Sequence, residues 1–414
     1  MHLETIEKTD DILVPGGCAF LHGTATEPRA LVEYWCNSPE SLSGVRLLTS
    51  FIPGLNTVNL AGLAPDQHVE TFMNQREYAV SEQSKQLTAL RYSYSRVRQH
   101  LCELARLDVA FVQLAPLKNG RYSTGITGGL IPTAIEKAHT VCGIVNNQMP
   151  VPKRSYTIAA NRVDYTINVS RPLIEFGAAT GEVNDVARKV AANVCSLIND
   201  GDTLQAGIGT IPTALFRMLE ERRNLRVFSG MVSDSFAQLT ASRSLDKRAE
   251  HVFGMALGSQ KFYQWLNERD GFRVAGVEET HSRERISNID KFVAVNSALS
   301  VGLDGIVNAE KIGSYAVSGP GGLPDFAAGA TGSDGGRSII ALASTNSKGT
   351  VSRITPSIDD FAAKTVPADH VTHVVTEHGI ADLRNVAADE RASRLLAIAD
   401  PAFRSDLKKA FEPE

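Results

Sequence analysis

A glycine turn near the middle of the chain is the first stretch whose residues could do chemistry. Residues 203–206 read as a short buried strand, Gly207 and Gly209 follow it, and a helix is expected from Thr210 with Pro212 in its first turn. Thr210 is a suitable N-cap, and proline is tolerated there because that N–H has no intrahelical partner. Glycine lets backbone amides approach a ligand, and a helix N-terminus favours negative charge. The stretch therefore predicts a site for a negatively charged group.

The same pattern occurs earlier in the chain. A gap-free shift of 184 residues places 17–31 on 201–215, so that Gly23 falls on Gly207. A second pair of apolar segments repeats in the same order, 109–115 and 292–298. Repetition at about half the chain length indicates two related α/β halves and not a short-period solenoid.

Other residues that could take part in binding or catalysis follow expected strands. The glycine-rich loop 318–326 and the turns at 344–349 and 377–379 are of this kind. In parallel sheets, ligands bind beyond the carboxyl ends of the strands. His22, in the first glycine turn, is assigned a structural role. Cys142 is a thiol that could serve as a nucleophile, but it lies in an apolar run with nothing nearby to lower its pKa.

These candidates must be positioned by alternating strands and helices. Strands are expected at 19–21, 107–114, 122–127, 140–145, 203–206, 225–229, 251–256, 292–296, 338–343 and 373–376. Helices are expected at 131–137, 183–197, 212–222, 260–268 and 388–399. Such alternation predicts an α/β protein with two related, open, mainly parallel sheets. The domains are expected at 1–180 and 181–414, with 164–185 as the connection.

Composition excludes several classes of partner. The 414 residues are 43% hydrophobic and 21% charged, with a formal net charge of −4, which gives no electrostatic case for nucleic acid or a membrane surface. The first residues lack the pattern of a signal peptide, and no apolar run is long enough to span a membrane. The five scattered cysteines form no CxxC motif, so we expect a cytoplasmic protein without a structural metal.

The motifs together resemble those of the acetyl-CoA hydrolase/transferase family, which includes 4-hydroxybutyrate CoA-transferase and has the class I CoA-transferase fold. Residues 201–215 resemble its GxTLQxGIGxIPxA turn, 318–326 its SGxGGxxDF loop, and 374–384 its VVTEYGVADLR segment. Shorter matches are 295–299 to INSAL, 352–354 to SRI, 27–28 to the end of GEP, and 145–150 to VNPQMP. The resemblance covers nearly the whole chain.

The resemblance implies thioester chemistry with coenzyme A or acyl-CoA as substrate. In the family, a glutamate attacks the acyl-CoA and an enzyme-CoA thioester follows, which divides one difficult displacement into easier steps. Backbone amides of glycine loops stabilise the oxyanion. CoA is expected in the cleft between the halves, mainly on the second half. The residues implied for this binding are Gly207, Ile208, Gly209, Asn296, Gly319, Gly321 and Gly322.

The chain departs from the family pattern at the nucleophile. The family segment H-T-E-M-x-S-D-G aligns with residues 228–235, and Gly230 falls on the glutamate. Glycine has no side chain to attack a thioester, although its open space could admit the acceptor itself. Three further departures supply candidate general bases, since Glu279, His281 and His378 replace Tyr, Asn and Tyr of the family.

Three interpretations remain open on the sequence alone. The first is an acyltransferase or hydrolase that works by direct attack, without a glutamyl-CoA intermediate. The second is enolate chemistry on a thioester, such as decarboxylation or carbon–carbon bond formation, and the third is a non-catalytic acyl-CoA-binding protein. The donor is either free CoA or an acyl carrier protein, because both carry a pantetheine arm. The resemblance also implies a homo-oligomer, most simply a dimer.

Overall fold

The computed structural model describes residues 1–177, 183–313, 315–358 and 362–411. They form two compact units. Unit 1 consists of Met1–Gly177 and Val252–Thr280, and unit 2 of Ala178–His251 and His281–Glu414. The sequence-based division at residue 180 differs from this grouping in the segment 252–280. Part of the expected connection, 178–182, lies outside the described residues.

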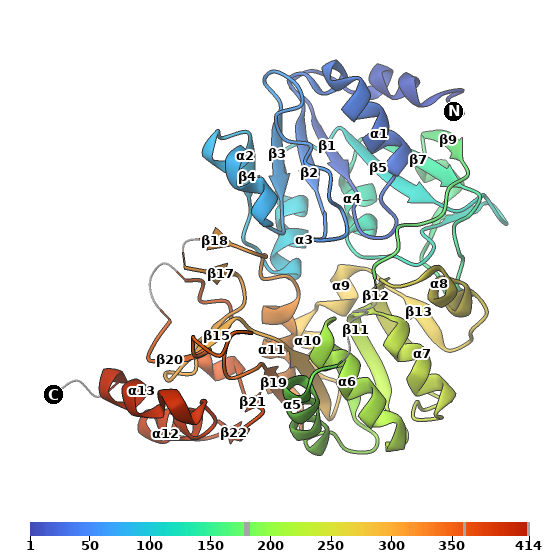
Figure 1. The fold of residues 1–414 in the computed structure, drawn as a ribbon. Helices are drawn as coiled ribbons and strands as arrows, with labels where there is room; N and C mark the ends of the chain where they lie inside the picture. Colours follow the sequence, from blue (N-terminus) through green and yellow to red (C-terminus); the bar gives the residue numbers. More distant parts are fainter. Residues whose placement is uncertain (178–182, 314, 359–361, 412–414) are drawn as a thin grey trace. The chain divides into compact units, whose positions relative to one another are not determined.

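Unit 1 is built on a seven-stranded sheet in the order β4-β3-β2-β1-β5-β7-β9, in which every neighbouring pair is parallel (Figure 1). The strands are β1 (Cys18–Leu21), β2 (Arg46–Thr49), β3 (His68–Thr71), β4 (Leu87–Ala89), β5 (Val109–Leu114), β7 (Thr140–Asn146) and β9 (Tyr165–Val169). All six residues of β5 are buried, which explains its unbroken apolar sequence, because helices cover both faces of a parallel sheet.

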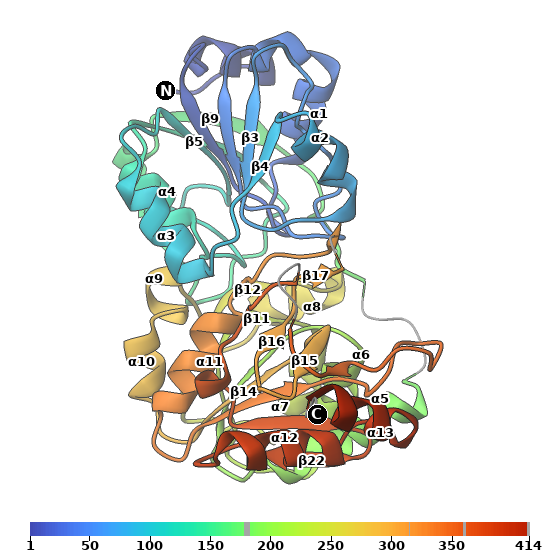
Figure 2. The ribbon, with the colours of Figure 1, turned by 90° about the vertical axis from the view of Figure 1, so that its left-hand side faces the viewer.

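Helices lie on both faces of the unit 1 sheet, with α1 on one face and α3 and α4 on the other (Figure 2). The helical elements are η1 (Ile6–Ile12), α1 (Arg29–Asn37), η2 (Pro39–Leu42), η3 (Arg76–Tyr78), α2 (Ala79–Gln83), α3 (Tyr94–Glu103), α4 (Ile131–Lys137), η4 (Ala160–Arg162), α8 (Gln260–Asn267) and α9 (Val277–Thr280). Trp35 of α1 is fully buried, and its ring packs edge-on against Phe111 of β5 with centroids 5.4 Å apart. Helix α1 is therefore anchored over the centre of the sheet.

Four further strands lie outside the seven-stranded sheet of unit 1. The pair β6 (Arg121–Ser123) and β8 (Thr157–Ala159) is antiparallel. The remaining strands of the 251–280 region are β12 (His251–Ala256) and β13 (Phe272–Val274).

Unit 2 repeats the arrangement of unit 1. Its strands follow the order β11-β10-β14-β19-β21-β22, in which only the last pair is antiparallel. Their bounds are β10 (Thr203–Ala206), β11 (Arg226–Val232), β14 (Phe292–Asn296), β19 (Arg337–Ala341), β21 (His373–Thr376) and β22 (Gly379–Asp382). Smaller strands are β15 (Ser300–Gly302), β16 (Val307–Asn308), β17 (Lys311–Ile312), β18 (Tyr315–Ala316) and β20 (Ile354–Thr355).

The helices of unit 2 also lie on two faces, with α10 and α11 on one and α5 and α6 on the other (Figure 2). They are α5 (Asp185–Ser196), α6 (Thr210–Met218), η5 (Leu219–Glu221), α7 (Asp234–Ala241), α10 (Arg283–Ser287), α11 (Leu323–Gly332), η6 (Ala368–His370), α12 (Ala388–Ala397), η7 (Pro401–Phe403) and α13 (Arg404–Phe411). No helix in the described ranges is both long and apolar enough to cross a membrane.

The internal repeat of the sequence corresponds to one position in each sheet. Strand β1 lies between β2 and β5, and β10 lies between β11 and β14, with parallel pairing in all four cases. The predicted α/β fold with two related, mainly parallel sheets is confirmed. Three strand ends were predicted wrongly. The strands expected at 122–127 and 338–343 end earlier, at Ser123 (β6) and Ala341 (β19), and β11 does not stop at residue 229 but continues to Val232.

Candidate active site

The glycine turn after β10 begins the site in unit 2. Gly209 has φ +125° and is the N-cap of α6, so Thr210 is the first helical residue and not the cap that the sequence predicted. Few residues other than glycine adopt this φ. The carbonyl of Gly209 accepts from the backbone N–H of Thr213 at 3.0 Å and from its hydroxyl at 2.9 Å. A side chain on Gly207 would meet no atom within 4 Å. The turn is thus open beside a helix N-terminus.

Two amide side chains lie near the ends of the neighbouring strands β10 and β14 and bind each other. Gln205 of β10 and Asn296 at the end of β14 exchange hydrogen bonds, with the Gln205 amide donating at 3.2 Å and the Asn296 amide at 2.9 Å. Gln205 is buried, whereas Asn296 is half-buried. The pair fixes both amides at the same edge of the sheet as the glycine turn.

The second glycine loop leads into α11. Gly321 has φ +56°, and Gly322 is the N-cap of the helix. Asp325, in the first turn, is fully buried, and its carboxylate lies 3.6 Å from the Arg283 guanidinium. A carboxylate is stabilised in the first turn of a helix by the dipole and by a cation nearby. The first turn of α11 therefore holds a buried carboxyl group beside Arg283, three residues after Gly322.

Gly230 and His281 are in contact, although 51 residues separate them in the sequence. A Cβ atom built on Gly230 would lie 2.9 Å from both Cε1 and Nε2 of His281, closer than real Cβ atoms approach. A Cβ atom on Gly322 would lie 2.6 Å from the same Nε2. The imidazole therefore fills the space in front of both glycines. The expectation that Gly230 leaves room for an acceptor is wrong, because His281 occupies that room.

The His281 ring is buried and uncharged near neutral pH. Its side chain is 2% exposed and packs against the ring of Phe326, with centroids 4.8 Å apart. Burial lowers the pKa of His281 to about 4, and the Asp325 carboxylate opposes this shift only in part. A neutral imidazole can accept a proton, but here it packs against protein atoms. The arrangement favours a positioning role.

Glu279 lies in unit 1, in α9. Its two carboxylate oxygens accept from the two terminal nitrogens of Arg273 at 2.7 and 2.6 Å. Such a bidentate pair holds the carboxylate in its ionised form and uses both oxygens. The geometry is that of a fixed ion pair more than of a base awaiting a proton.

His378 lies in unit 2 at the turn between β21 and β22. Its Nε2 is 3.7 Å from Asp400 and 3.9 Å from Glu377, and the side chain is 26% exposed. Strand β21 is separated from β11 by four strand spacings of roughly 4.8 Å each, which is about 19 Å. The structure therefore brings His281 to Gly230 but leaves His378 at a distance from both.

Two further side chains can be assigned from their burial. Cys142 is fully buried in β7, and burial raises the pKa of its thiol to about 12, so the protonated thiol is a poor nucleophile. His22 is also buried, and burial lowers its pKa to about 3. Among the residues that the structure describes, no three His, Cys, Asp or Glu side chains are grouped to hold a metal ion.

Sequence reasoning missed the contact between Gly230 and His281. Both positions stood out as departures from the family pattern, Gly for Glu and His for Asn, but as separate ones. Nothing in a single chain links residues so far apart. Covariation of the two positions among relatives is the signal that would have revealed the pair.

The fold and the glycine turns define a protein of the CoA-transferase type. The family model of the acetyl-CoA hydrolase/transferase C-terminal domain matches residues 258–411. The chain is 37% identical to 4-hydroxybutyrate coenzyme A transferase of Clostridium kluyveri, over 74% of this chain and 72% of that protein. It is 30% identical to a succinyl-CoA:acetate/propanoyl-CoA:succinate CoA transferase of Fasciola hepatica, over 98% of this chain and 86% of that protein.

A solved structure agrees with these relatives. The crystal structure of 4-hydroxybutyrate CoA-transferase from Porphyromonas gingivalis superimposes with a TM-score of 0.80 at 28% identity, covering 99% of this chain and 96% of that one. The chain belongs to the acetyl-CoA hydrolase/transferase family.

Proposed function

We propose that the protein moves the acyl group of an acyl-CoA thioester to water or to a small acceptor by direct attack, without a glutamyl-CoA intermediate. The observation that supports this is the packing at Gly230. The position has no side chain, and the buried ring of His281 occupies the space in front of it. Position 230 of β11 supplies no carboxylate, so we assign the attack to an oxygen of water or of the acceptor.

The proposed reaction needs an oxyanion site and a place for CoA. An acceptor O–H attacks the carbonyl carbon, a C–O bond forms, and the resulting oxyanion collapses as the C–S bond breaks. The acceptor proton ends on the CoA sulfur, so that free CoA leaves. Preorganised backbone amides stabilise such an oxyanion at little reorganisation cost. We assign this role to Gly207, Ile208 and Gly209, and CoA binding to the same turn together with Asn296, Gly319, Gly321 and Gly322.

The three candidate bases receive different roles in this proposal. His281 is a positioning residue, since it packs between the glycines and not against open space. Glu279 is held by Arg273 through both oxygens, which disfavours proton transfer. His378 is partly exposed and lies beside Asp400, but three strand spacings, about 14 Å, separate β21 from β10 and its glycine turn, so we do not assign His378 as the base that deprotonates the acceptor.

The donor and the assembly belong to the same proposal. Free CoA and a carrier-protein thioester both present a pantetheine arm, so either can be the donor. The acceptor is a small molecule, because the family relatives are named for small acids. A homodimer in the cytoplasm remains our prediction from the family resemblance.

Mass spectrometry tests the proposal directly. The protein is incubated with acetyl-, butyryl- or succinyl-CoA in ¹⁸O-water, with and without a carboxylic acid, and both products and intact protein are weighed. We expect CoA release and no covalent adduct on the protein. An enzyme-CoA adduct, or a glutamate trapped by borohydride, would show that another residue has replaced the nucleophile and would overturn the proposal.

A further inference from the structure

Unit 1 contains a cavity of about 740 Å³ that none of the sequence-predicted site residues lines. Its walls come from the segment before and within β6, from residues 149–157 and from the end of α8. Three cationic side chains line it, Lys118, Arg121 and Lys153, and no Asp or Glu is among the lining residues. An excess of positive charge in a concave site raises the local concentration of negatively charged ligands.

A tight turn places two of these cations. Asn119 and Gly120 both have positive φ, +53° and +71°, as a two-residue type I′ turn requires. The flanking residues Lys118 and Arg121 exchange backbone hydrogen bonds of 2.9 and 3.0 Å. Because they pair across the turn, their side chains start from the same face of the hairpin.

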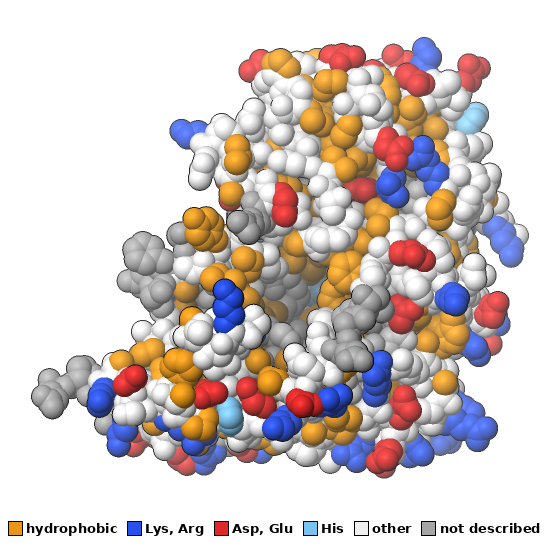
Figure 3. Space-filling model, in the orientation of Figure 1, with side chains coloured by type: hydrophobic (Ala, Val, Ile, Leu, Met, Phe, Trp, Pro, Cys, Tyr) orange, Lys and Arg blue, Asp and Glu red, His pale blue; other side chains and the backbone are white. Residues whose placement is uncertain are grey.

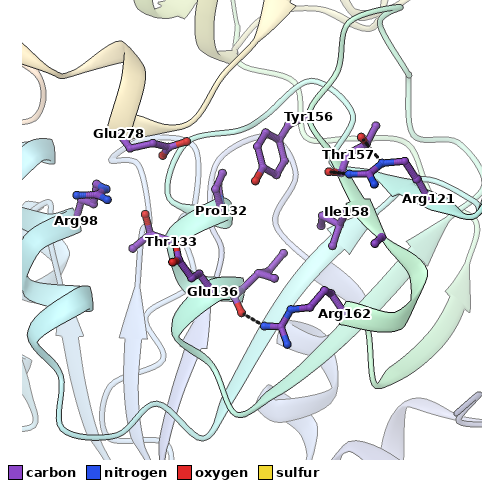
Figure 4. Close-up of a pocket in the computed structure, with 12 residues that line it drawn as sticks. Arg98, Arg121, Pro132, Thr133, Glu136, Tyr156, Thr157, Ile158, Arg162 and Glu278 are labelled. Carbon is purple, nitrogen blue, oxygen red and sulfur yellow. Dashed lines mark hydrogen bonds between the residues drawn. The ribbon is translucent and has the colours of Figure 1, made fainter. Parts of the chain in front are cut away.

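The Arg121 guanidinium is held in a fixed orientation. Its Nε donates to the Thr157 hydroxyl at 2.8 Å and its Nη2 to the Thr157 carbonyl at 2.8 Å (Figure 4). Neither of these two hydrogen bonds uses Nη1, the other terminal nitrogen of the guanidinium. A guanidinium that is already oriented loses less entropy when it binds an oxyanion than a mobile lysine does.

The third cation can change partners at low cost. Lys153 Nζ lies 2.9 Å from Asp270, and the two side chains are 57% and 82% exposed. Exposed ion pairs contribute little to stability, so a bound anion can compete for the ammonium. The side-chain carbonyl oxygen of Asn267 accepts from the backbone N–H of Val151 at 2.8 Å. This hydrogen bond does not use the side-chain N–H groups of Asn267.

Apolar side chains also line the cavity. Met149, Pro150, Val151 and Pro152 line it in succession, and Val151 is 39% exposed. Ligand sites combine an apolar surface with a few oriented polar groups. A ligand for this cavity therefore carries negative charge at one end and apolar surface at the other.

A neighbouring cavity provides a contrast. It has about 680 Å³ and shares Arg121 and Thr157 with the first, but it is also lined by the carboxylates of Glu136 and Glu278 (Figure 4). Arg162 lines only this second cavity, where its guanidinium donates to the Ile135 carbonyl at 2.8 Å. Its three arginines, Arg98, Arg121 and Arg162, face these two carboxylates, whereas no carboxylate lines the first cavity, so the first cavity has the larger excess of positive charge.

We propose that the cavity lined by Lys118, Arg121 and Lys153 binds the phosphate end of a phosphorylated small molecule, whose apolar part lies against residues 149–152. The ligand chemistry is that of a nucleotide: a di- or triphosphate, or the phosphorylated end of CoA, joined to a body with apolar surface. None of the residues that line this cavity belongs to the thioester site proposed for unit 2.

Calorimetry with defined probes tests the proposal. Pyrophosphate, ADP and CoA are titrated into the full-length protein at low and high salt, with adenosine as the uncharged control. We expect pyrophosphate and ADP to bind and adenosine to bind far more weakly, with affinity falling as salt rises. The double variant Lys118→Ala/Lys153→Ala should weaken binding of both phosphate ligands by at least tenfold.

Two matched variants make the result interpretable. Arg162→Ala removes a cation from the neighbouring cavity and should leave phosphate affinity unchanged, whereas Lys118→Arg should retain binding. Competition between ADP and CoA would identify CoA as the physiological source of the phosphate group, and independent saturation would identify a free nucleotide. Failure of the wild-type protein to bind any phosphate probe at millimolar concentration would overturn the proposal. Equal affinities in the double variant and the wild type would overturn it too.

Discussion

At the scale of single residues, the contact between Gly230 and His281 determines what chemistry β11 can supply. Each of the two residues differs from the one that the family has at that position, and the sequence alone does not explain either difference. Together they form a packed pair, in which the missing side chain at 230 makes room for a buried imidazole. Cores lack the free space to accommodate a larger side chain without movement, so a glutamate at 230 requires His281 to move or to be replaced by a smaller residue.

A pair of variants tests this coupling. Gly230→Glu alone should destabilise the protein by about 1–3 kcal/mol, because its Cβ atom would overlap His281. The φ of Gly230 lies outside the left-handed region, so the backbone accepts a glutamate. We expect Gly230→Glu/His281→Asn to recover stability and to form an enzyme-CoA adduct with acyl-CoA, as seen in the intact mass. An adduct on the single variant Gly230→Glu, or on His281→Asn alone, would contradict the coupling.

Glu27 gives a prediction about pH in unit 1. It is 5% exposed, its Oε1 has no hydrogen-bond partner within the described residues, and burial raises its pKa from 4.5 to about 7. Between these values the native state keeps a proton that the unfolded chain has released. The free energy of unfolding should therefore fall by about 3 kcal/mol as pH rises from 4.5 to 7.

The measurement uses the two tryptophans, Trp35 and Trp265, which both belong to unit 1 and report on its unfolding. Urea unfolding followed by tryptophan fluorescence at pH 5, 6, 7 and 8 should show that Glu27→Gln removes most of this pH dependence. Glu40→Gln changes an exposed carboxylate in the same unit and should leave the pH dependence of unfolding unchanged. An unchanged slope in Glu27→Gln would show that other groups cause the dependence.

At the scale of elements, the strands whose bounds the sequence predicted best are buried along all or nearly all of their length. The bounds of β10, β12, β14 and β21 agree with the residue patterns because apolar runs between glycine and polar turns leave little ambiguity. The end of β11 was missed because Gly230 reads as a turn residue, and its place in the sheet depends on a distant imidazole. The first helical element, η1 (Ile6–Ile12), is a 3₁₀-helix, and periodicity over seven residues cannot distinguish such a helix from an α-helix.

The turn between β10 and α6 contains two glycines with different requirements, which a substitution series can separate. Gly209→Ala should destabilise unit 2 by about 1–3 kcal/mol, because φ +125° is strained for alanine. Gly207→Val should leave stability nearly unchanged, since its side chain enters open space, but should weaken CoA binding by covering the backbone amides.

Calorimetry with CoA and thermal unfolding followed by circular dichroism together resolve the two effects. Gly322→Ala is a poor substitute for Gly207→Val, because its Cβ atom would meet His281 and disturb the fold. Wild-type CoA affinity in Gly207→Val would exclude this turn from the CoA site.

At the scale of the whole molecule, the charge pattern agrees with a protein that acts on small molecules. Acidic and basic side chains are interspersed over the face seen in Figure 3, consistent with the formal charge of −4. The repeat in the sequence predicted two related units, and the strand orders agree with it. What it did not predict is that residues 252–280 group with unit 1, because pairings of distant segments leave no local pattern.

Several contacts tie residues 252–280 to the first segment of unit 1. The backbone N–H groups of Gly128 and Gly129 donate to the Gly254 carbonyl at 2.8 and 3.2 Å. The hydroxyl of Tyr263 donates to the carbonyl of Ile174 at 2.9 Å. Tyr263 is fully buried, so its removal would expose apolar surface and leave buried polar groups without partners.

Two fragments test whether this grouping is a folding unit. Residues 1–180, cut at the boundary that the sequence predicted, should aggregate or unfold without a cooperative transition. Residues 1–177 joined through a Gly/Ser linker of about twelve residues to 252–280 should unfold cooperatively, because the joined chain keeps the contacts of Gly254 and Tyr263. The backbone N–H of Phe176 donates to the Gly258 carbonyl at 3.1 Å, and the extended strand β12 carries the chain about 20 Å from Gly258 back to Val252, a distance that such a linker can span. Thermal unfolding of both fragments, followed by Trp35 fluorescence, decides between the boundaries: equal midpoints would show that 252–280 is dispensable and that a domain ending at 180 folds alone.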